Sequence, residues 1–278
     1  MTTLNRDSLY ARKLLLLLPD NLHLVLIGCG GTGSWLAPHL VRITKLLTEL
    51  HDREVSLTFW DHDHVEPKNV YRQNFCQAEV GANKATALAQ RYGLAWGVNI
   101  HAIGQPFTGE FPFQREFAGH ETIYITCVDH NRPRREVAQR CDRYGGWWVD
   151  TGNRKLSGQV SVGRAFAEGE PSPLRLPSVT TWTPLPSVQF PDIWQDEEES
   201  NPEADDYSEM SCADLALLDE QGLSINHAVA SATATLLTRM LVTHDLNYHC
   251  AYVSTESGTS LAYNAPRILK KYLKELRA

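Results

Sequence analysis

The stretch NLHLVLIGCGGTGS, residues 21–34, decides the fold of this chain. Its first half, 21–27, is short and almost continuously apolar, which is typical of a buried strand in a parallel sheet. Its second half is a glycine-rich turn, and residues 34–50 that follow are apolar at helical spacing. Pro38 falls in the first turns of that segment, where proline is tolerated. The stretch therefore predicts a strand–turn–helix unit.

The turn itself predicts a nucleotide-binding site. Glycine lets the chain turn tightly and lets backbone N–H groups approach a phosphate closely, and the positive end of the helix dipole adds to that attraction. The residues concerned are Gly28, Gly30, Gly31, Gly33 and Ser34. A glycine triplet alone is weak evidence, since a purely structural turn has the same composition. Its position between a strand and a helix makes nucleotide binding the preferred interpretation.

Strand and helix patterns continue to alternate after this unit. Further strands are predicted at 55–60, 98–103, 122–128 and 147–151, with helices at 83–92 and 132–144. Residues 158–166 predict an antiparallel strand, 224–242 a helix rich in small residues, 247–254 and 259–263 a hairpin, and 266–276 an amphipathic helix. The expected fold is α/β and Rossmann-like: a mainly parallel sheet with helices on both faces and an antiparallel C-terminal extension.

Composition limits the classes of protein to consider. The net charge of −7 argues against nucleic acid as a main partner, because phosphate neutralisation requires a basic face. Residues 14–18 are too short an apolar run to span a membrane, and the N-terminus lacks the apolar core of a signal peptide. The six cysteines include no C-x-x-C pair, so zinc is not expected. We expect a cytoplasmic protein with reduced thiols.

A second group of polar residues follows the strand at 55–60. Asp61 stands at the strand end, where α/β nucleotide-binding proteins carry the carboxylate that binds ribose hydroxyls; capping a turn is its alternative role. That position does not separate a dinucleotide from ATP. A triphosphate needs several converging donors, and a dinucleotide dehydrogenase does not. The residues Asn69, Arg72 and Lys84 therefore favour ATP over a dinucleotide.

Four further positions near this group carry two interpretations each. Asp63 binds ligand or braces the loop, and Gln73 contacts ligand or orients Arg72. His62 and His64 flank Asp63 and hold a metal or lie on an exposed loop edge.

Asp129 ends the strand predicted at 122–128. A carboxylate at the carboxyl end of a central parallel strand faces the ligand crevice, and Mg²⁺ prefers one or two carboxylates together with phosphate oxygens. The alternative role of Asp129 is to cap the helix at 132–144.

Four motifs together resemble the ThiF/MoeB/ubiquitin-activating-enzyme superfamily. They are G-x-G-G-x-G-S from Gly28, D-x-D-x-V from Asp61, N-x-x-R-Q from Asn69 and C-V-D ending at Asp129, with Lys84 between the last two. The resemblance implies ATP-dependent adenylation of the C-terminal carboxylate of a ubiquitin-like or sulfur-carrier protein, with release of pyrophosphate. It implies that Asp61 holds the ribose, that Asn69, Arg72 and Lys84 bind the phosphates, and that Asp129 binds Mg²⁺.

The resemblance also implies an organisation and partners. It implies a single adenylation domain over 1–278, with a nucleotide-binding half at 1–150 and a carrier-binding and dimerisation half at 151–278. The partners are a small ubiquitin-like (β-grasp) carrier protein, a second copy of the chain, and a conjugating enzyme or a JAB-type protease. The compact form without C-x-x-C pairs is similar to the PRTRC-system ThiF subgroup. Arg6 and Arg12 are candidates for an arginine that acts in the partner's site.

Residues 168–210 are expected to form a crossover loop. Its strongly acidic part, 196–209, is interpreted as a solvated loop or as a lid or docking strip for a basic partner. Cys212 follows, just before a helix predicted at 213–220, where a thiol has a depressed pKa. The resemblance implies a thioester there; a buried structural cysteine is the alternative. Cys29 and Cys127 are interpreted as structural.

Two other functions stay open from the residues. One is an NAD-dependent oxidoreductase, which leaves Arg72, Lys84 and Asp129 unexplained together. The other is a non-catalytic ATP-binding scaffold of the same fold, against which the complete set of residues argues. Related enzymes also adenylate other carboxylates, such as a peptide terminus or a carboxylate on tRNA.

Overall fold

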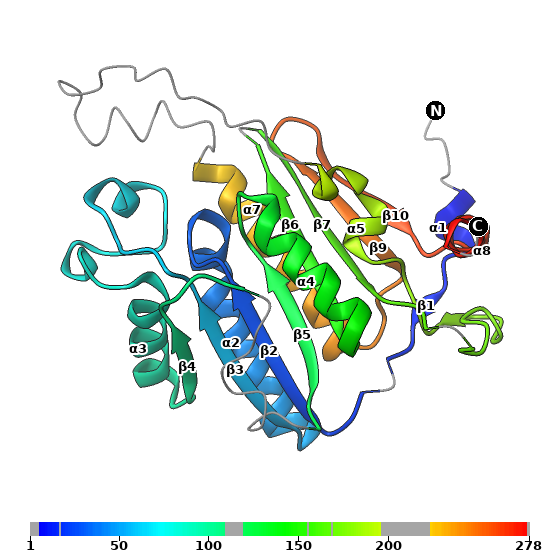
Figure 1. Ribbon diagram of the computed structural model, residues 1–278, viewed down its shortest axis with the longest axis horizontal. Helices are drawn as coiled ribbons and strands as arrows, with labels where there is room; N and C mark the ends of the chain where they lie inside the picture. Colours follow the sequence, from blue (N-terminus) through cyan, green and yellow to red (C-terminus); the bar gives the residue numbers. More distant parts are fainter. Residues whose placement is uncertain are drawn as a thin grey trace.

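The computed structural model describes residues 6–16, 18–108, 119–154, 156–167, 169–195 and 223–276. Within these residues the chain forms one eight-stranded sheet in the order β10-β9-β7-β6-β5-β2-β3-β4 and a two-stranded pairing of β1 with β8. Helices cover both faces of the large sheet (Figure 1). The expected α/β fold is therefore confirmed.

The parallel part of the sheet places the site. It consists of β2 (Asn21–Ile27), β3 (Glu54–Trp60), β4 (Ile100–Ile103), β5 (Glu121–Thr126) and β6 (Trp147–Asn153). β2 is central, and its Leu26 lies opposite Phe59 of β3 and Ile125 of β5. The chain builds the sheet outward from β2 through β3 to β4, then returns to the other side of β2 with β5. Such a switch point opens a crevice at the carboxyl ends of the strands.

The remaining strands form the antiparallel extension that the sequence predicts. β7 (Ser157–Arg164) pairs antiparallel with β6 and with β9 (Tyr248–Ser254). β10 (Gly258–Tyr263) completes a hairpin with β9 and forms one edge of the sheet. The last residues of β6 and β9 and the first residues of β7 thus continue the edge at which the parallel strands end.

Two apolar cores separate the sheet from its helices. α2 (Gly31–His51), α3 (Lys84–Trp96) and α7 (Leu223–Leu241) cover one face, and α4 (Asn131–Tyr144) and α5 (Pro186–Gln189) cover the other. Successive residues of β2 alternate between them: Leu24 and Leu26 belong to the first core, and Val25 and Ile27 to the second. Burial on both faces explains the continuous apolar run at 21–27.

Short elements escaped prediction because they carry no periodicity. They are α1 (Arg6–Leu9), β1 (Lys13–Leu14), β8 (Val179–Thr180), α5 and the 3₁₀ turn η3 (Pro191–Trp194). The last three, β8, α5 and η3, lie within the expected crossover loop 168–210. The acidic segment 196–209, Cys212 and the helix predicted at 213–220 lie outside the described residues.

The remaining helical elements are α8 (Pro266–Glu275) and the 3₁₀ turns η1 (Pro67–Tyr71) and η2 (Gln77–Glu79). Among the helices of the described ranges, none combines the length and the low polarity that crossing a bilayer requires.

Candidate functional site

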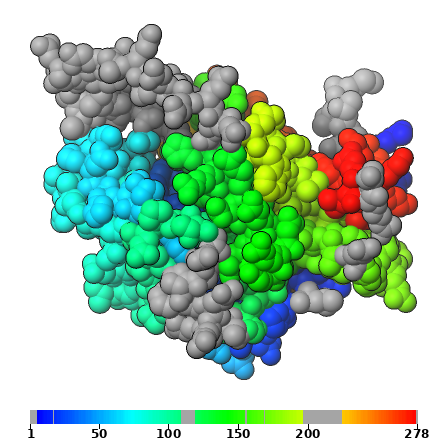
Figure 2. Space-filling view, viewed as in Figure 1, coloured from blue at the N-terminus to red at the C-terminus, as the bar shows by residue number. Residues whose placement is uncertain are grey.

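A cleft of about 1540 Å³ opens at the carboxyl ends of the parallel strands. Its lining comes from the glycine turn, the loops after β3 and β5, the first residue of α3 and the ends of β6, β7 and β9. In Figure 2 blue atoms of the first part of the chain lie recessed between the cyan and green surfaces. Small-molecule sites usually measure about 300–1,000 Å³, so this cleft has room for a nucleotide and a second substrate.

The glycine turn is fixed by contacts that admit no side chain. Gly28 has a φ of +89°, and a Cβ there would lie 2.5 Å from the carbonyl oxygen of Cys127 on the neighbouring strand end. A Cβ on Gly33 would lie 1.9 Å from the carbonyl oxygen of Gly28. Gly30 and Gly31 line the cleft at the start of α2. The turn therefore presents the free N–H groups of a helix N-terminus to the cleft.

Asp61 holds this turn from the end of β3. Its carboxylate accepts hydrogen bonds from the N–H of Cys29 at 2.6 Å and from the N–H of Asp63 at 2.8 Å. Burial raises the pKa of Asp61, and the two N–H donors and the charge of Lys84 offset part of that rise. Asp61 is 9% exposed and lines the cleft, so a lone pair stays available on each oxygen for a ligand hydroxyl.

Lys84 places a buried cation in the cleft. Its side chain is 8% exposed, and Nζ lies 2.9 Å from Oδ2 of Asp63. Burial opposes ionisation of Asp63, but the hydrogen bond from Lys84 and its charge outweigh that cost and hold the pKa of Asp63 below its ordinary value. Lys84 is the first residue of α3, and Asn83 caps that helix by accepting from the N–H of Thr86. The cap fixes the backbone of Lys84, and with it the point from which the side chain extends into the cleft.

The turn η1 brings Asn69, Arg72 and Gln73 to the same cleft. Asn69 is 2% exposed, and its Oδ1 accepts the N–H of Glu66 at 2.9 Å. This bond holds the oxygen of the Asn69 amide and leaves its nitrogen as a donor. Gln73 is 5% exposed, and its Oε1 has no hydrogen-bond partner among the described residues. The backbone of Arg72 is held by Nε1 of Trp35, which donates to its carbonyl oxygen at 3.2 Å.

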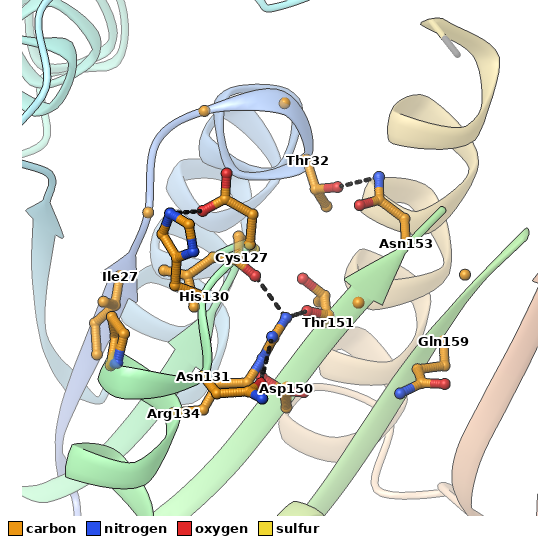
Figure 3. Close-up of a pocket in the computed structure, with 18 of the residues that line it drawn as sticks. Ile27, Thr32, Cys127, His130, Asn131, Arg134, Asp150, Thr151, Asn153 and Gln159 are labelled. Carbon is orange, nitrogen blue, oxygen red and sulfur yellow. Dashed lines mark hydrogen bonds and ion pairs between the residues drawn. The ribbon is translucent and has the colours of Figure 1, made fainter. Parts of the chain in front are cut away.

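Asp129 lies on the opposite wall of the cleft, in the loop after β5. Its side chain is 73% exposed, with Nε2 of His130 3.7 Å from Oδ1. The N-cap of α4 is His130, so Asp129 does not occupy the capping position that was its alternative role. Figure 3 shows His130 and Asn131 beside the cavity, with Arg134 below them. An exposed carboxylate facing a cleft suits a hard cation such as Mg²⁺.

Four predicted residues lie apart from the cleft lining, namely Gly33, Ser34, Arg6 and Arg12. Gly33 and Ser34 stand behind the turn, where Oγ of Ser34 accepts from the N–H of Asn74 at 2.9 Å and so joins α2 to the loop after η1. Arg12 donates to the carbonyl oxygens of Leu174 and Leu176, far along the chain from the turn. Arg6 begins α1, and neither arginine lines the cleft.

The cysteines near the cleft are unsuited to nucleophilic chemistry. Cys29 is fully buried, and burial raises the pKa of its thiol well above the ordinary value. Burial likewise raises the pKa of Cys127 to about 12. Thiols with such pKa values carry almost no thiolate at neutral pH, which agrees with a structural role for both.

Sequence reasoning missed two groups of lining residues. In the first, Arg134 donates from Nε to Oδ1 of Asp150 at 3.0 Å, and Thr126 donates to the same oxygen. The buried strand 147–151 contains a single carboxylate, and a buried charge requires a partner, so Asp150 was a usable signal. In the second, Thr32 and Asn153 meet Asn226 of α7, and no local pattern reveals that contact.

The fold and cleft define a Rossmann-like α/β protein with a polar cleft at its switch point. The model of the ThiF family matches residues 18–274, and the chain belongs to that family. Ubiquitin-like modifier-activating enzyme 5 of Oryza sativa subsp. japonica is 27% identical over an alignment of 155 positions that covers 50% of this chain and 34% of that protein. The chain thus spans about a third of this curated relative.

Solved structures show the same fold. PaaA superimposes with a TM-score of 0.55 at 14% identity, over 88% of this chain and 64% of that one. MccB of E. coli gives a TM-score of 0.54 at 16% identity, over 89% and 64%. MccB of E. coli solved with ATP gives 0.52 at 14% identity, over 88% and 64%. At such identities the likeness carries the fold alone.

Proposed function

We propose that this chain uses ATP to adenylate the C-terminal carboxylate of a ubiquitin-like or sulfur-carrier protein. One observation carries the proposal: Lys84, Arg72 and Asn69 line the same cleft as the glycine turn, and Asp129 faces them from the loop after β5. Membership of the ThiF family supports it, as do a relative named an activating enzyme and a fold neighbour solved with ATP.

The proposed reaction needs no protein nucleophile. An oxygen of the substrate carboxylate attacks the α-phosphorus of ATP and forms a new P–O bond. The bond from the α-phosphorus to the bridging oxygen breaks, and pyrophosphate leaves with that electron pair. Catalysis then consists of positioning and neutralisation of charge.

Each residue of the cleft has a place in this scheme. The N–H groups of the turn, Asn69, Arg72 and Lys84 bind phosphate oxygens, and Asp61 accepts from the ribose hydroxyls. Asp63 orients Lys84 through their ion pair. Oε1 of Gln73, which has no hydrogen-bond partner in the described part of the chain, is an acceptor beside the turn. The exposed carboxylate of Asp129 fits Mg²⁺, which supplies further charge neutralisation on the phosphates when bound.

ATP–pyrophosphate exchange tests the proposal. Candidate carrier proteins ending in Gly-Gly, and peptides with the same ending, serve as carboxylate substrates. We expect Arg72→Ala and Asp129→Ala to lower exchange by at least about 100-fold, the usual effect of removing a charge-stabilising group. Arg42→Ala and Asp142→Ala, outside the cleft lining, are the matched controls. Exchange that survives in both cleft variants contradicts the assignment.

A thioester on Cys212 is the second proposed step. The sulfur would attack the acyl-adenylate carbonyl and release AMP, which conserves the activated acyl group. We expect a thiol-sensitive adduct between enzyme and carrier that Cys212→Ala abolishes while pyrophosphate exchange continues. Cys76→Ala is the control, since Cys76 is an exposed free cysteine. An adduct that persists in Cys212→Ala removes this residue from the mechanism.

The proposed organisation follows from the same assignment. Residues 1–150 bind the nucleotide, and residues 151–278 bind the carrier and form a homodimer; Arg6 or Arg12 reaches the partner's site. A conjugating enzyme or a JAB-type protease acts downstream, as in a PRTRC-type system. A mass of two chains in light scattering, and loss of exchange in Arg6→Ala or Arg12→Ala, are the expected results.

A further inference from the structure

The outward side of α8 is a basic surface that the proposed adenylation does not use. Its exposed cations recur at helical spacing, at Arg267, Lys270, Lys271 and Lys274, and together they are called the basic face. These four residues lie outside the cleft lining. The chain as a whole carries a net charge of −7, so this helix has the opposite sign to the rest of the molecule. Such a charge asymmetry indicates a surface for an anionic partner.

Nearby carboxylates do not neutralise the basic face. Glu275 lies 3.8 Å from Nζ of Lys271, a separation at which two exposed charges attract weakly. Asp7 of α1 pairs with Arg267. Among the residues that the structure describes, Lys270 and Lys274 have no carboxylate partner. The face therefore keeps a net positive charge.

The opposite side of α8 anchors the helix to the sheet. Leu269 is fully buried, and Ile268, Tyr272 and Leu273 are half-buried. The ring of Tyr272 lies 6.1 Å from the ring of His249 on β9, at an angle of 83°. Since these apolar side chains pack within the molecule, α8 presents its cations from a fixed position and cannot turn its apolar side to a partner.

Exposed apolar side chains lie at the rim of the basic face. Figure 1 shows α1 beside α8, and Nε of Arg267 donates to Oδ1 of Asp7 at 2.6 Å across the two helices. Just after Asp7, Leu9 and Tyr10 are 66% and 70% exposed. Leu276, which follows α8, is 46% exposed. The surface therefore combines cations with large apolar and aromatic side chains.

This combination fits an anionic lipid bilayer better than other anionic partners. Lysine side chains are attracted to negative headgroups, and tyrosine is favoured at the boundary between headgroups and acyl chains. A soluble polyanion would engage the cations alone and would leave Leu9 and Tyr10 in water. A second copy of the chain that docked symmetrically on this face would bring like charges together.

We propose that the basic face of α8, with Leu9, Tyr10 and Leu276 at its rim, binds the surface of an anionic bilayer. The helix lies flat on the headgroups, and the rim side chains reach the headgroup–acyl boundary. The attraction is mainly electrostatic, and salt screens it over about 8 Å at physiological ionic strength. Binding is therefore peripheral and reversible. The proposal is independent of the adenylation reaction, because no residue of the cleft takes part.

Co-sedimentation of the full chain with lipid vesicles tests the proposal. Vesicles of phosphatidylcholine alone are compared with vesicles that contain about 30% phosphatidylserine, whose surface is negative. We expect the chain to bind the anionic vesicles only. It should leave them when the salt concentration is raised to about 1 M, where the screening length falls to about 3 Å. Lys270→Gln/Lys271→Gln/Lys274→Gln should weaken the binding by about 100-fold, the effect of removing three cations from an anionic surface.

A matched variant controls for the change in net charge. Arg42→Gln/Lys45→Gln/Arg143→Gln removes the same charge from α2 and α4 and should bind the anionic vesicles as the wild type does. Lys270→Gln/Lys274→Gln replaces the triple variant if that variant does not fold, and the comparison of vesicles and of salt concentrations stands without any variant. Equal binding to the two kinds of vesicle, or undiminished binding when the lysines of α8 are replaced, overturns the proposal.

The rim side chains distinguish a bilayer from a soluble polyanion. Leu9→Ser/Tyr10→Ser keeps every cation of the basic face and should weaken vesicle binding by about ten-fold, because less apolar surface is buried at the headgroup–acyl boundary. Poly-glutamate serves as the soluble probe. Binding to poly-glutamate as tight as binding to anionic vesicles, together with unchanged vesicle binding in Leu9→Ser/Tyr10→Ser, overturns the proposal in favour of an acidic polypeptide.

Discussion

Arg134 donates a hydrogen bond from Nε to Oδ1 of Asp150 over 3.0 Å, and the same guanidinium group binds the carbonyl oxygens of Val128 and Thr151. The side chains of Arg134 and Asp150 are 11% and 3% exposed. Val128 immediately precedes Asp129, so this pair ties the loop that carries Asp129 to the end of β6. The position of the Asp129 loop relative to β6 therefore depends on a buried charge pair.

Breaking this pair is predicted to be costly. Arg134→Ala leaves the carboxylate of Asp150 buried without its cation, and such a loss destabilises proteins by about 3–5 kcal/mol. We expect this decrease in the free energy of unfolding by urea denaturation. Replacing both residues with apolar ones, in Arg134→Met/Asp150→Leu, recovers a large part of it, because no charge is then left unpaired.

Arg143→Ala is the matched control, since Arg143 is exposed in the last turn of the same helix. It is expected to change stability by no more than about 0.5 kcal/mol. A cost in Arg134→Ala as small as that of the control contradicts the prediction.

Adding a methyl group to two glycines of the turn is predicted to have different effects, on stability at Gly33 and on ATP affinity at Gly30. In Gly33→Ala the new Cβ would lie 1.9 Å from the carbonyl oxygen of Gly28, which forces the backbone to shift. Overpacking of this kind costs about 1–3 kcal/mol or more in stability. In Gly30→Ala the Cβ would meet nothing nearer than Nε2 of Gln73 at 3.9 Å. Its methyl group projects at the helix N-terminus instead, where phosphate must approach.

We therefore expect Gly33→Ala to lower the unfolding temperature strongly. Gly30→Ala should leave the unfolding temperature nearly unchanged and lower ATP affinity by about ten-fold or more in calorimetry, the effect of hydrogen bonds lost to a charged ligand. An equal loss of stability in the two variants would argue that Gly30 is structural as well.

The parts of the site that the sequence predicts are local. The turn at 28–33 and the carboxylate of Asp61 follow directly from consecutive residues, because a strand end and a helix start fix them. The contact of Thr32 with Asn226 spans 194 residues and depends on how α7 packs on α2. No pattern in either segment encodes that packing. The small residues of 224–242 indicated close packing of this helix, and within the described chain Ala230 and Ala234 are buried in the core shared with α2.

The start of α2 is a second feature that local sequence patterns do not predict. Apolar spacing predicts a start at Ser34, whereas α2 begins at Gly31. Apolar periodicity marks the buried face of a helix, and the glycines of the first turn contribute nothing to it. Helix ends are fixed by hydrogen bonding, which periodicity does not report.

Trp35 is predicted to position Arg72 for the nucleotide. Its Nε1 donates to the carbonyl oxygen of Arg72 at 3.2 Å, and its ring lies 3.6 Å from that of His227 on α7. Trp35→Phe keeps an aromatic ring and removes the donor, a loss of about 1 kcal/mol. We expect KM for ATP to rise about five-fold with little change in kcat.

Trp96→Phe provides the comparison, because Trp96 is 36% exposed on α3 and outside the cleft lining. It should leave both constants unchanged. An unaltered KM for ATP in Trp35→Phe means that Arg72 is positioned without this hydrogen bond.

Two buried histidines are predicted to make the fold sensitive to acid. Burial lowers the pKa of His249 to about 4, although Asn264 binds its Nδ1 at 3.1 Å, and burial lowers that of His23 to about 3. The unfolded chain binds a proton at each site near pH 6.5, and the folded chain does so only below these lower values. Stability therefore falls as the pH drops from about 6.5, by about 1.4 kcal/mol per pH unit for each histidine. The contribution of His249 levels off near pH 4.

The free energy of unfolding, measured by urea denaturation between pH 7 and pH 4, reports this slope. His249→Gln removes one proton from the linkage and should flatten the slope by about 1.4 kcal/mol per pH unit, while the contribution of His23 stays. His51→Gln, an exposed position at the end of α2, should leave the slope as it is. The folded chain carries His249 neutral from pH 7 down to about pH 5. An unchanged slope in His249→Gln would show instead that the side chain is hydrated and titrates as it does in the unfolded state.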